Sequence, residues 1–249
     1  MRCLARRVFG GILLALGAMP VSIDAAGAAD FSKQRARLVE TVRAHAAQPG
    51  SGAPGGRISP RVLAAMGAVP RHVLVPERHR HMAYADRPLP IGYGQTISQP
   101  YIVALMTELL RAGPKEVVLE VGTGSGYQAA VLSRLVRHVY TIEIVEGLAR
   151  RAAADLARLG YGNVTVRAGD GYKGWPEHAP FDGIMVTAAP KVIPPPLIAQ
   201  LKPGGRLVMP LEGALGRQSL IVIEKDRDGR IVRRNVIAVR FVPLTRNPR

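Results

Sequence analysis

The residues that most clearly suggest chemistry are a run of glycines and the acidic residues around it. The run Glu120-Val121-Gly122-Thr123-Gly124-Ser125-Gly126 follows a short apolar segment at 117–119. Glycine has no Cβ atom, so the backbone at Gly122 and Gly124 can turn tightly and bring its N–H groups close to a ligand. Glu143 lies 21 residues after Gly122, where a carboxylate at the end of the next strand accepts hydrogen bonds from ribose hydroxyls. This spacing suits a nucleoside-containing cofactor or a dinucleotide.

Two residues beside the turn favour one of these ligands. A dinucleotide site needs a glycine three positions after Gly124, but this sequence has Tyr127 there. Glu120 directly precedes the turn, and its carboxylate would repel a pyrophosphate but suits the ammonium of a methionine moiety and tolerates a sulfonium. No G-K-[ST] sequence follows, which excludes a P-loop. The pattern favours S-adenosylmethionine, and a purely structural strand–helix turn is the alternative.

Two other segments carry polar side chains that could either bind a ligand or cap a turn or helix. Asp170 follows a third predicted strand and can reach an adenine edge from there, or it can cap a turn. The run Gln95-Thr96-Ile97-Ser98-Gln99-Pro100 offers hydroxyls and amides that can bind a carboxylate or cap the following helix. From the pattern alone, capping is the favoured interpretation of this run.

Alternating strands and helices must hold these residues in place. Apolar runs predict strands at 117–119, 139–142, 164–166, 183–186 and 206–209, with helices at 127–136, 146–159 and 197–201 between them. This repetition predicts an α/β fold, a parallel sheet with helices on both faces. A turn at 226–229 predicts a C-terminal hairpin. Upstream we expect helices at 31–48, 60–69 and 101–112, a flexible run at 48–56 and a loop at 89–100.

Size and composition narrow the function further. The 249 residues suffice for one sizeable α/β domain with appendages. The net charge is +16, but the arginines are dispersed and aromatic residues are only 5%, too few for base stacking. We therefore expect no nucleic-acid partner and interpret the charge as solvated surface, with a modest benefit for acidic substrates. Cys3 is the single cysteine, and His79 and His81 lack a third ligand, so we expect no metal site.

The N-terminus has the pattern of an export signal. Arg2, Arg6 and Arg7 precede the apolar stretch 8–19, and small residues end at Ala26-Gly27-Ala28. The stretch is too short to span a bilayer, so stable membrane insertion is not expected. A wrongly assigned start site or an uncleaved N-terminal helix is the alternative.

Several segments together resemble one family, the protein-L-isoaspartate O-methyltransferases. They occur in the family's order, cover residues 60–246, and are the runs 90–100, 120–127, 169–171, 201–206 and 241–245. The glycine-rich turn is common to many methyltransferases, whereas Thr96-Ile97-Ser98 points to the substrate. The resemblance implies a doubly wound, Rossmann-like class I methyltransferase fold, with a seven-stranded, mostly parallel sheet and one reversed strand near the C-terminus.

The resemblance also implies an activity and the residues that support it. The expected reaction is methyl transfer from S-adenosyl-L-methionine to the free carboxylate of L-isoaspartyl and D-aspartyl residues in damaged proteins, which initiates repair through a succinimide. Ser98 corresponds to the active-site serine, and Ile97, Ser98 and Val242 to substrate-binding residues. The implied cofactor-binding residues are Gln95, Thr96, Ile97, Glu120, Gly122, Gly124, Glu143, Asp170, Gly171 and Thr245.

The expected organisation follows from these assignments. Residues 1–28 form a signal-like segment, 29–59 an N-terminal helix and linker, and 60–249 the methyltransferase domain, which we expect to act as a monomer. The family and the supply of cofactor favour the cytoplasm, whereas residues 1–28 favour export, so the compartment stays open.

Two rival functions remain at this stage. Methyltransferases of base amino groups carry an Asp/Asn-Pro-Pro-aromatic run where this chain has Thr187-Ala188-Ala189-Pro190, which disfavours a nucleic-acid substrate, and a small-molecule substrate is a further possibility. A cofactor-binding module without turnover is the second rival. The intact Thr96-Ile97-Ser98 and Glu143 argue against it.

Overall fold

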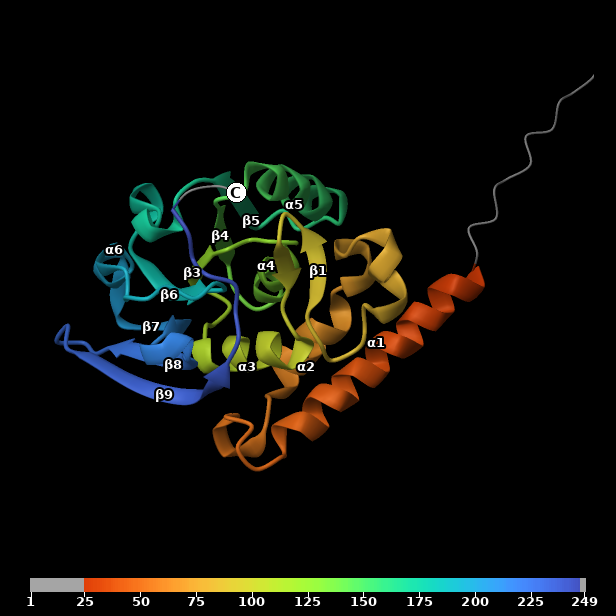
Figure 1. Cartoon of the computed structure of the whole chain (residues 1–249), viewed down its shortest axis with the longest axis horizontal. Helices are drawn as coiled ribbons and strands as arrows, with labels where there is room; N and C mark the ends of the chain where they lie inside the picture. Colours follow the sequence, from red (N-terminus) through yellow and green to blue (C-terminus); the bar gives the residue numbers. More distant parts are fainter. Residues whose placement is uncertain (1–24, 247–249) are drawn as a thin grey trace, which may run out of the picture.

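A seven-stranded sheet forms the centre of the protein, whose computed structural model describes residues 25–246 (Figure 1). The strand order is β5-β4-β3-β6-β7-β8-β9. Strands β5 to β7 are parallel, and β8 runs antiparallel to both of its neighbours. This arrangement confirms the predicted mostly parallel sheet with one reversed strand. The strands are β3 (Val117–Val121), β4 (His138–Glu143), β5 (Val164–Ala168), β6 (Phe181–Val186), β7 (Leu201–Glu212), β8 (Gln218–Lys225) and β9 (Ile231–Val239).

Helices cover both faces of this sheet because its central strands are apolar on both sides. Val118 and Leu119, consecutive in β3, are both fully buried but belong to two separate hydrophobic clusters. The first cluster joins the sheet to α1 (Ala25–Ala46), α2 (Pro60–Ala68), α3 (Pro100–Leu110), α4 (Tyr127–Ser133) and α5 (Glu146–Arg158). The second cluster joins it to α6 (Pro195–Ala199) and to the segment between β5 and β6. The predicted doubly wound architecture is therefore confirmed.

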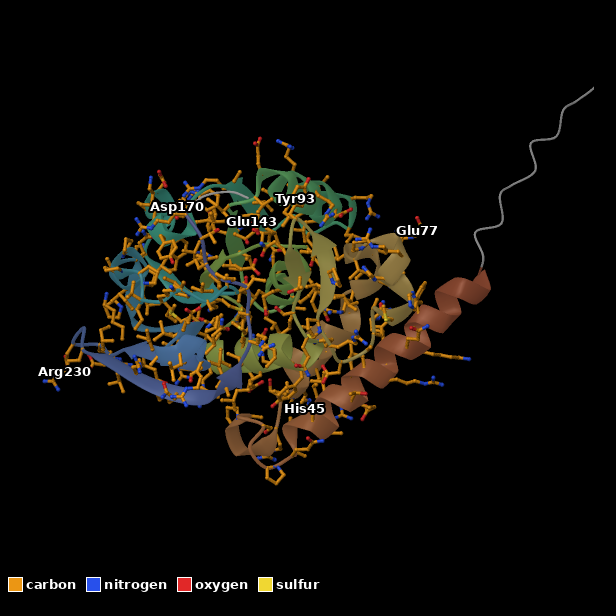
Figure 2. The ribbon with its side chains drawn as sticks, in the orientation of Figure 1. His45, Glu77, Tyr93, Glu143, Asp170 and Arg230 are labelled. Atoms are coloured by element: carbon orange, nitrogen blue, oxygen red, sulfur yellow. The ribbon has the colours of Figure 1, made fainter. Side chains whose placement is uncertain are left out.

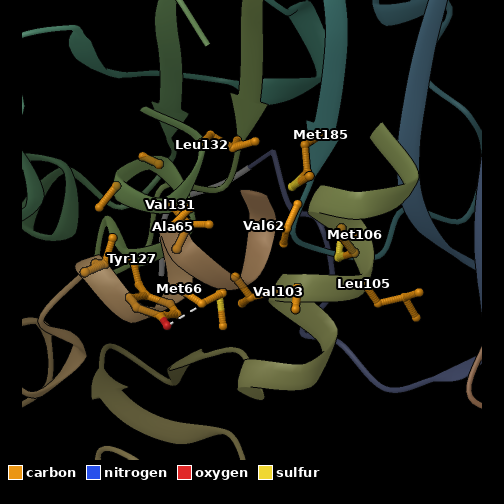
Figure 3. Close-up of a cluster of buried hydrophobic side chains, with 14 of the residues drawn as sticks. Val62, Ala65, Met66, Val103, Leu105, Met106, Tyr127, Val131, Leu132 and Met185 are labelled. Atoms are coloured by element: carbon orange, nitrogen blue, oxygen red, sulfur yellow. Dashed lines mark hydrogen bonds between the residues drawn. The ribbon is translucent and has the colours of Figure 1, made fainter. Parts of the chain in front are cut away.

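The close-up of the first cluster shows what holds the helix after the glycine-rich turn (Figure 3). Met66 of α2 lies beside Tyr127, the first residue of α4, while Met106 of α3 and Met185 of β6 lie farther off in the same cluster. Tyr127 is 2% exposed, and its hydroxyl donates to Met66 Sδ at 3.7 Å. The fully buried Arg71 guanidinium lies 4.7 Å from the Tyr127 ring centroid. A large aromatic residue thus packs where a dinucleotide site would need a glycine.

The predicted loop at 89–100 is wrong in part, because most of it forms a hairpin. Strand β1 (Leu89–Gly92) pairs antiparallel with β2 (Gln95–Ile97). Leu89 and Ile91 alternate inward and are almost completely buried, but two apolar residues are too few for a recognisable strand period. The turn between the strands has positive φ angles at Gly92, Tyr93 and Gly94. Short 3-10 helices lie at Pro54–Gly56, Arg71–Leu74, Glu77–Met82, Gly171–Lys173, Pro176–His178 and Ala214–Gly216.

The N-terminal helix α1 packs along the body of the protein (Figure 1). This helix was predicted at 31–48 and is found at Ala25–Ala46. The predicted end of the signal-like segment, Ala28, therefore lies within the helix. Residues 1–24 of that segment fall outside the described part. Leu38 and Val42 are buried in the first cluster. The following run was predicted to be flexible; within it Ser51 is buried and accepts a hydrogen bond from Tyr101 at its carbonyl oxygen, whereas Gln48, Pro49 and Gly50 are exposed. No helix between residues 25 and 246 is long and apolar enough to cross a membrane.

Candidate active site

Three adjoining cavities lie at the carboxyl edge of the sheet, where the strand order reverses between β3 and β6. All three are lined by both Thr96 and Thr187, so they are immediate neighbours. The turn cavity, about 550 Å³, lies between the glycine-rich turn and the segment after β9. The inner cavity, about 320 Å³, reaches Glu120. The groove, about 1010 Å³, lies between Ser98 and the end of β9. Ligands of open α/β sheets bind at such a reversal point.

The glycine-rich turn packs tightly against the end of β6. Gly122 has a φ of +98°, and a Cβ atom there would lie 2.3 Å from Thr187 Oγ1. The Thr187 hydroxyl donates to the Gly122 carbonyl oxygen at 2.6 Å, and the Gly122 N–H donates to the Ile142 carbonyl oxygen at 2.8 Å. Gly124 also has a positive φ, and both glycines line the turn cavity. Only glycine fits this combination of φ and close approach.

Glu143 ends β4 as predicted, and it lines the turn cavity. The side chain is 5% exposed. One oxygen accepts the Gly124 N–H at 2.8 Å and the other accepts the Val145 N–H at 2.9 Å. Burial raises the pKa of Glu143, and the backbone hydrogen bonds oppose this shift. The carboxylate is therefore fixed in orientation by the turn itself.

Glu120 is fully buried and borders the inner cavity. The Thr141 hydroxyl donates to Glu120 Oε2 at 2.6 Å, whereas Oε1 has no hydrogen-bond partner within the described part of the chain. Burial is the main cause that raises the pKa of Glu120 to about 8; the Thr141 hydrogen bond opposes this shift, and the nearby charge of Glu143 adds to it. A buried polar atom without a partner is costly, so an unpaired carboxylate oxygen beside a cavity fits a cationic ligand group.

The hairpin and the residue after it line all three cavities. Gln95 borders the turn cavity, and Thr96 borders all three. Ile97 is 3% exposed and lines the inner cavity. Ser98 lines both the inner cavity and the groove, so it lies where the two spaces meet. The structure thus brings these four predicted residues to one site.

The capping interpretation of this run is wrong. The N-terminal cap of α3 is Gln99, whose side chain makes no capping hydrogen bond. Instead Asp86 Oδ1 accepts the Tyr101 N–H at 2.8 Å, and Asp86 Oδ2 accepts from Gln99 Nε2 at 3.0 Å. His45 Nδ1 lies 3.0 Å from the same Oδ2 atom, and its ring stacks on Tyr101. The Asp86 carboxylate, from another loop, therefore accepts a free backbone N–H at the start of α3 and holds the side chain of Gln99, the neighbour of Ser98.

Asp170 shows the turn-capping role that was its alternative interpretation. Its Oδ1 atom accepts the Tyr172 N–H at 2.9 Å. Asp170 does not line the turn cavity, although it follows β5 at the same edge of the sheet (Figure 2). Gly171 does line the cavity, and a Cβ atom there would lie 2.3 Å from Val121 Cγ1.

The C-terminal segment closes the turn cavity from the other side. Val242 and Thr245 both line it, and Val242 also lines the groove. The Ala189 N–H donates to the Val242 carbonyl oxygen at 2.8 Å, and the Leu244 N–H donates to the Ala189 carbonyl oxygen at 2.9 Å. These bonds tie the segment after β9 to the end of β6, so residues more than fifty positions apart meet at one wall.

Sequence reasoning missed three residues near the site. Thr187 borders every cavity, and Ile144 gives the turn cavity an apolar wall. Both directly follow strands of the parallel sheet, so the rule that ligands bind at carboxyl ends of strands could have identified them. No sequence pattern identifies Asp86, because the backbone N–H that it caps belongs to Tyr101, 15 residues later in the chain. Between residues 25 and 246, no three His, Cys, Asp or Glu side chains are grouped to hold a metal ion.

Comparisons with known proteins agree with the resemblance. The family model for protein-L-isoaspartate(D-aspartate) O-methyltransferase (PCMT) matches residues 53–249. Protein-L-isoaspartate O-methyltransferase 2 of Syntrophobacter fumaroxidans is 53% identical over 244 residues, which is 97% of this chain and 99% of the relative. Protein-L-isoaspartate O-methyltransferase 1 of Cupriavidus necator is 55% identical over 227 residues, 91% of this chain and 87% of the relative.

Solved structures extend the agreement to the fold. A protein-L-isoaspartate O-methyltransferase superposes with a TM-score of 0.74 at 30% identity, covering 86% of this chain and 67% of that chain. A putative family member from Plasmodium falciparum in complex with S-adenosyl-L-homocysteine has a TM-score of 0.71 at 24% identity, covering 86% and 99%, and supports the fold alone. The chain is therefore a member of the protein-L-isoaspartate(D-aspartate) O-methyltransferase family.

Proposed function

We propose that this protein transfers a methyl group from S-adenosyl-L-methionine to the free carboxylate of L-isoaspartyl and D-aspartyl residues in damaged proteins. The observation that carries the proposal is the position of Ser98, which lies between the inner cavity at Glu120 and an open groove. A donor bound on one side and a peptide bound on the other would meet there. The names of the full-length relatives support the same reaction. The backbone amide nitrogen then attacks the methyl ester and expels methanol, which gives a succinimide. Hydrolysis of the succinimide yields partly normal aspartate and so repairs the chain.

The residues around the turn and inner cavities fit the proposed cofactor, which supplies an electrophilic methyl group when bound. Glu120 Oε1, buried and unpartnered in the described chain, would accept the ammonium group of the methionine part. Gly122 and Gly124 would present backbone to the same part, and Glu143 would accept the ribose hydroxyls. The orphaned carboxylate oxygen and the glycine wall are thus complementary to an amino-acid nucleoside.

The adenine end would lie toward the residues after β5 and β9. Gly171, Thr245 and the apolar side chain of Ile144 line this part of the turn cavity. Asp170 lies outside the lining and caps the turn that contains Gly171. We therefore propose that Asp170 supports the adenine end by fixing this turn and by offering its second oxygen, while Gln95, Thr96 and Ile97 cover the cofactor from the hairpin.

The reaction needs alignment more than activation. An α-carboxylate has a pKa of about 3.3–3.7, so it is ionised near neutrality and needs no general base. Holding the carboxylate oxygen in line with the methyl carbon can supply up to about 7–11 kcal/mol. Ser98 would hydrogen-bond the carboxylate, and Ile97 and Val242 would bracket the peptide backbone. No histidine lines the inner cavity or the groove in the described chain, and the Glu120 carboxyl group there is hydrogen-bonded to Thr141. We therefore propose no base that would make Ser98 a nucleophile.

The experiment that tests this role compares Ser98→Ala with the wild type on an isoaspartyl peptide. Loss of a hydrogen bond to a charged group costs about 1.5–3 kcal/mol, so kcat/KM should fall about 10- to 100-fold. S-adenosylhomocysteine affinity, measured in parallel, should fall less than kcat/KM, because the proposed hydrogen bond of Ser98 is to the substrate carboxylate. The same peptide with normal aspartate serves as the control substrate. Full turnover by the variant would refute the positioning role.

We further propose that the protein acts as a monomer and without a nucleic-acid partner. The support is the dispersion of its arginines and the low aromatic content of 5%. Light scattering of the purified protein and methylation assays on DNA and RNA would test the two statements. A dimer mass or methylated nucleic acid would contradict them.

For the N-terminus we propose that residues 1–28 are an export signal, 29–59 a helix and linker, and 60–249 the methyltransferase domain. The charged residues, apolar stretch and Ala26-Gly27-Ala28 support this division. Cleavage after Ala28 would keep Leu38 and Val42 of α1 in the core. Mass spectrometry of the mature N-terminus after cell fractionation would test it, and an intact Met1 in the cytoplasmic fraction would contradict it.

A further inference from the structure

The groove is much larger than a single carboxylate requires. The groove and the solvent space at its mouth amount to about 1010 Å³, nearly twice the about 550 Å³ of the turn cavity. One wall carries Ser98 and Gln99, and the other is the stretch of chain from 238 to 242 at the end of β9. The residues that flank the modified position of a bound peptide must therefore lie in this groove, where its lining can distinguish them.

The groove has a one-sided charge. Among the lining residues between 25 and 246, Arg240 is the single charged one, and it is exposed. None of the described carboxylates lies within ion-pairing distance of Arg240, although Arg150, Arg158 and Arg206 elsewhere each have such a partner. Residues 231–249 contain five arginines and no aspartate or glutamate. The segment that supplies this wall thus carries positive and no negative side chains, and Arg240 is the one that lines the groove.

The nearest acidic group on the opposite wall does not neutralise this charge. Asp86 lies behind Gln99, and its carboxylate is already engaged by Gln99 Nε2, the Tyr101 N–H and His45. Its side chain is only 12% exposed. Of the other arginines near the end of the chain, Arg246 packs over the Tyr172 ring, so Arg240 is the cation that the groove presents.

We infer that Arg240 makes the groove selective for isoaspartyl residues flanked by acidic residues. This inference rests on the proposed function and names the class of substrate within it. The guanidinium attracts a neighbouring aspartate or glutamate and repels a lysine or arginine. Exposed ion pairs of this kind change an equilibrium by about two- to fivefold, and salt screens them. Arg240 is therefore a specificity-determining residue.

The test uses three isoaspartyl peptides of one sequence that differ only in whether the two flanking residues are glutamate, glutamine or lysine. The wild type should methylate the glutamate peptide with a kcat/KM about two- to fivefold above that of the glutamine peptide, and the lysine peptide most slowly. High salt should bring the three values together. Arg240→Gln should abolish the ratio, and Arg240→Glu should reverse it.

Arg230→Gln is the matched control, because Arg230 is an exposed arginine at the tip of the same hairpin, away from the groove (Figure 2). It should keep the wild-type ratio. Equal rates on the three peptides, or a wild-type ratio in Arg240→Gln, would overturn the inference while leaving the proposed function intact. A uniform loss on all three peptides in Arg240→Gln would also overturn it, since the arginine would then bind the isoaspartyl carboxylate itself. Failure of the wild type on every peptide would overturn both.

Discussion

Cofactor affinity should depend on pH through Glu120. The free protein holds this buried carboxyl with a pKa of about 8, because burial disfavours its charged form. An ammonium group beside it requires the ionised form. Binding below pH 8 must therefore release a proton, and each pH unit below 8 weakens binding about tenfold, or about 1.4 kcal/mol. Because half of the protein is already protonated at pH 8, the affinity should fall about 50-fold between pH 8 and pH 6, which is about 2.3 kcal/mol.

The assay is calorimetric titration with S-adenosylhomocysteine, which carries the same ammonium group and cannot react. Repeating it in buffers of different ionisation enthalpy measures the released proton directly. In Glu120→Gln the amide oxygen can still accept from Thr141, but the charge is lost. Affinity of this variant should be independent of pH from 6 to 8 and about 10- to 100-fold below that of the wild type at pH 8.

Glu143→Gln is the informative control, because it removes the other carboxylate of the site. The charge of Glu143 raises the pKa of Glu120, so this variant should keep the tenfold slope but begin to weaken at a lower pH. A flat wild-type profile without proton release would refute the reasoning, since Glu120 would then be ionised throughout or would not contact the ammonium group.

Three further predictions follow from the same geometry. Gly122→Ala places a Cβ atom 2.3 Å from a hydroxyl at a φ of +98°, and we expect thermal melts to show a larger loss of stability than Gly160→Ala, where φ is +80° and the space is open. Asp86→Asn should weaken the start of α3 at Tyr101 by about 0.5–2 kcal/mol and raise KM for peptide more than it lowers kcat; an unchanged KM would contradict this. Glu120 has a raised pKa in the folded state, so its stabilising contribution is present below pH 4.5 and is lost as pH rises through about 8. Denaturant titration should therefore show a decline over this range that Glu120→Gln reduces, by at most about 5 kcal/mol.

Local patterns determined the elements and the chemistry at strand ends. The apolar runs of β3, β4 and β6, with helices between them, are apparent in the sequence because buried parallel strands are apolar on both faces. The order of strands and helices also determines which residues stand at carboxyl ends of strands, so Glu120, Gly122 and Glu143 were identifiable as one site. The family motifs added Ser98, which no periodicity would have selected.

Contacts between distant segments were decided only by the tertiary structure. The hairpin at 89–97 has too short an alternation to be recognised, and it is stable because Leu89 and Ile91 are buried beneath it. Asp86 caps α3 at Tyr101, and His45 on α1 contacts the Asp86 carboxylate in turn. No local sequence pattern indicates either contact. The unpaired oxygen of Glu120 and the cationic groove at Arg240 likewise depend on which strands are neighbours. A sequence specifies each residue's own propensity and charge, whereas burial, desolvation and partners over long chain separations exist only once the sheet has formed.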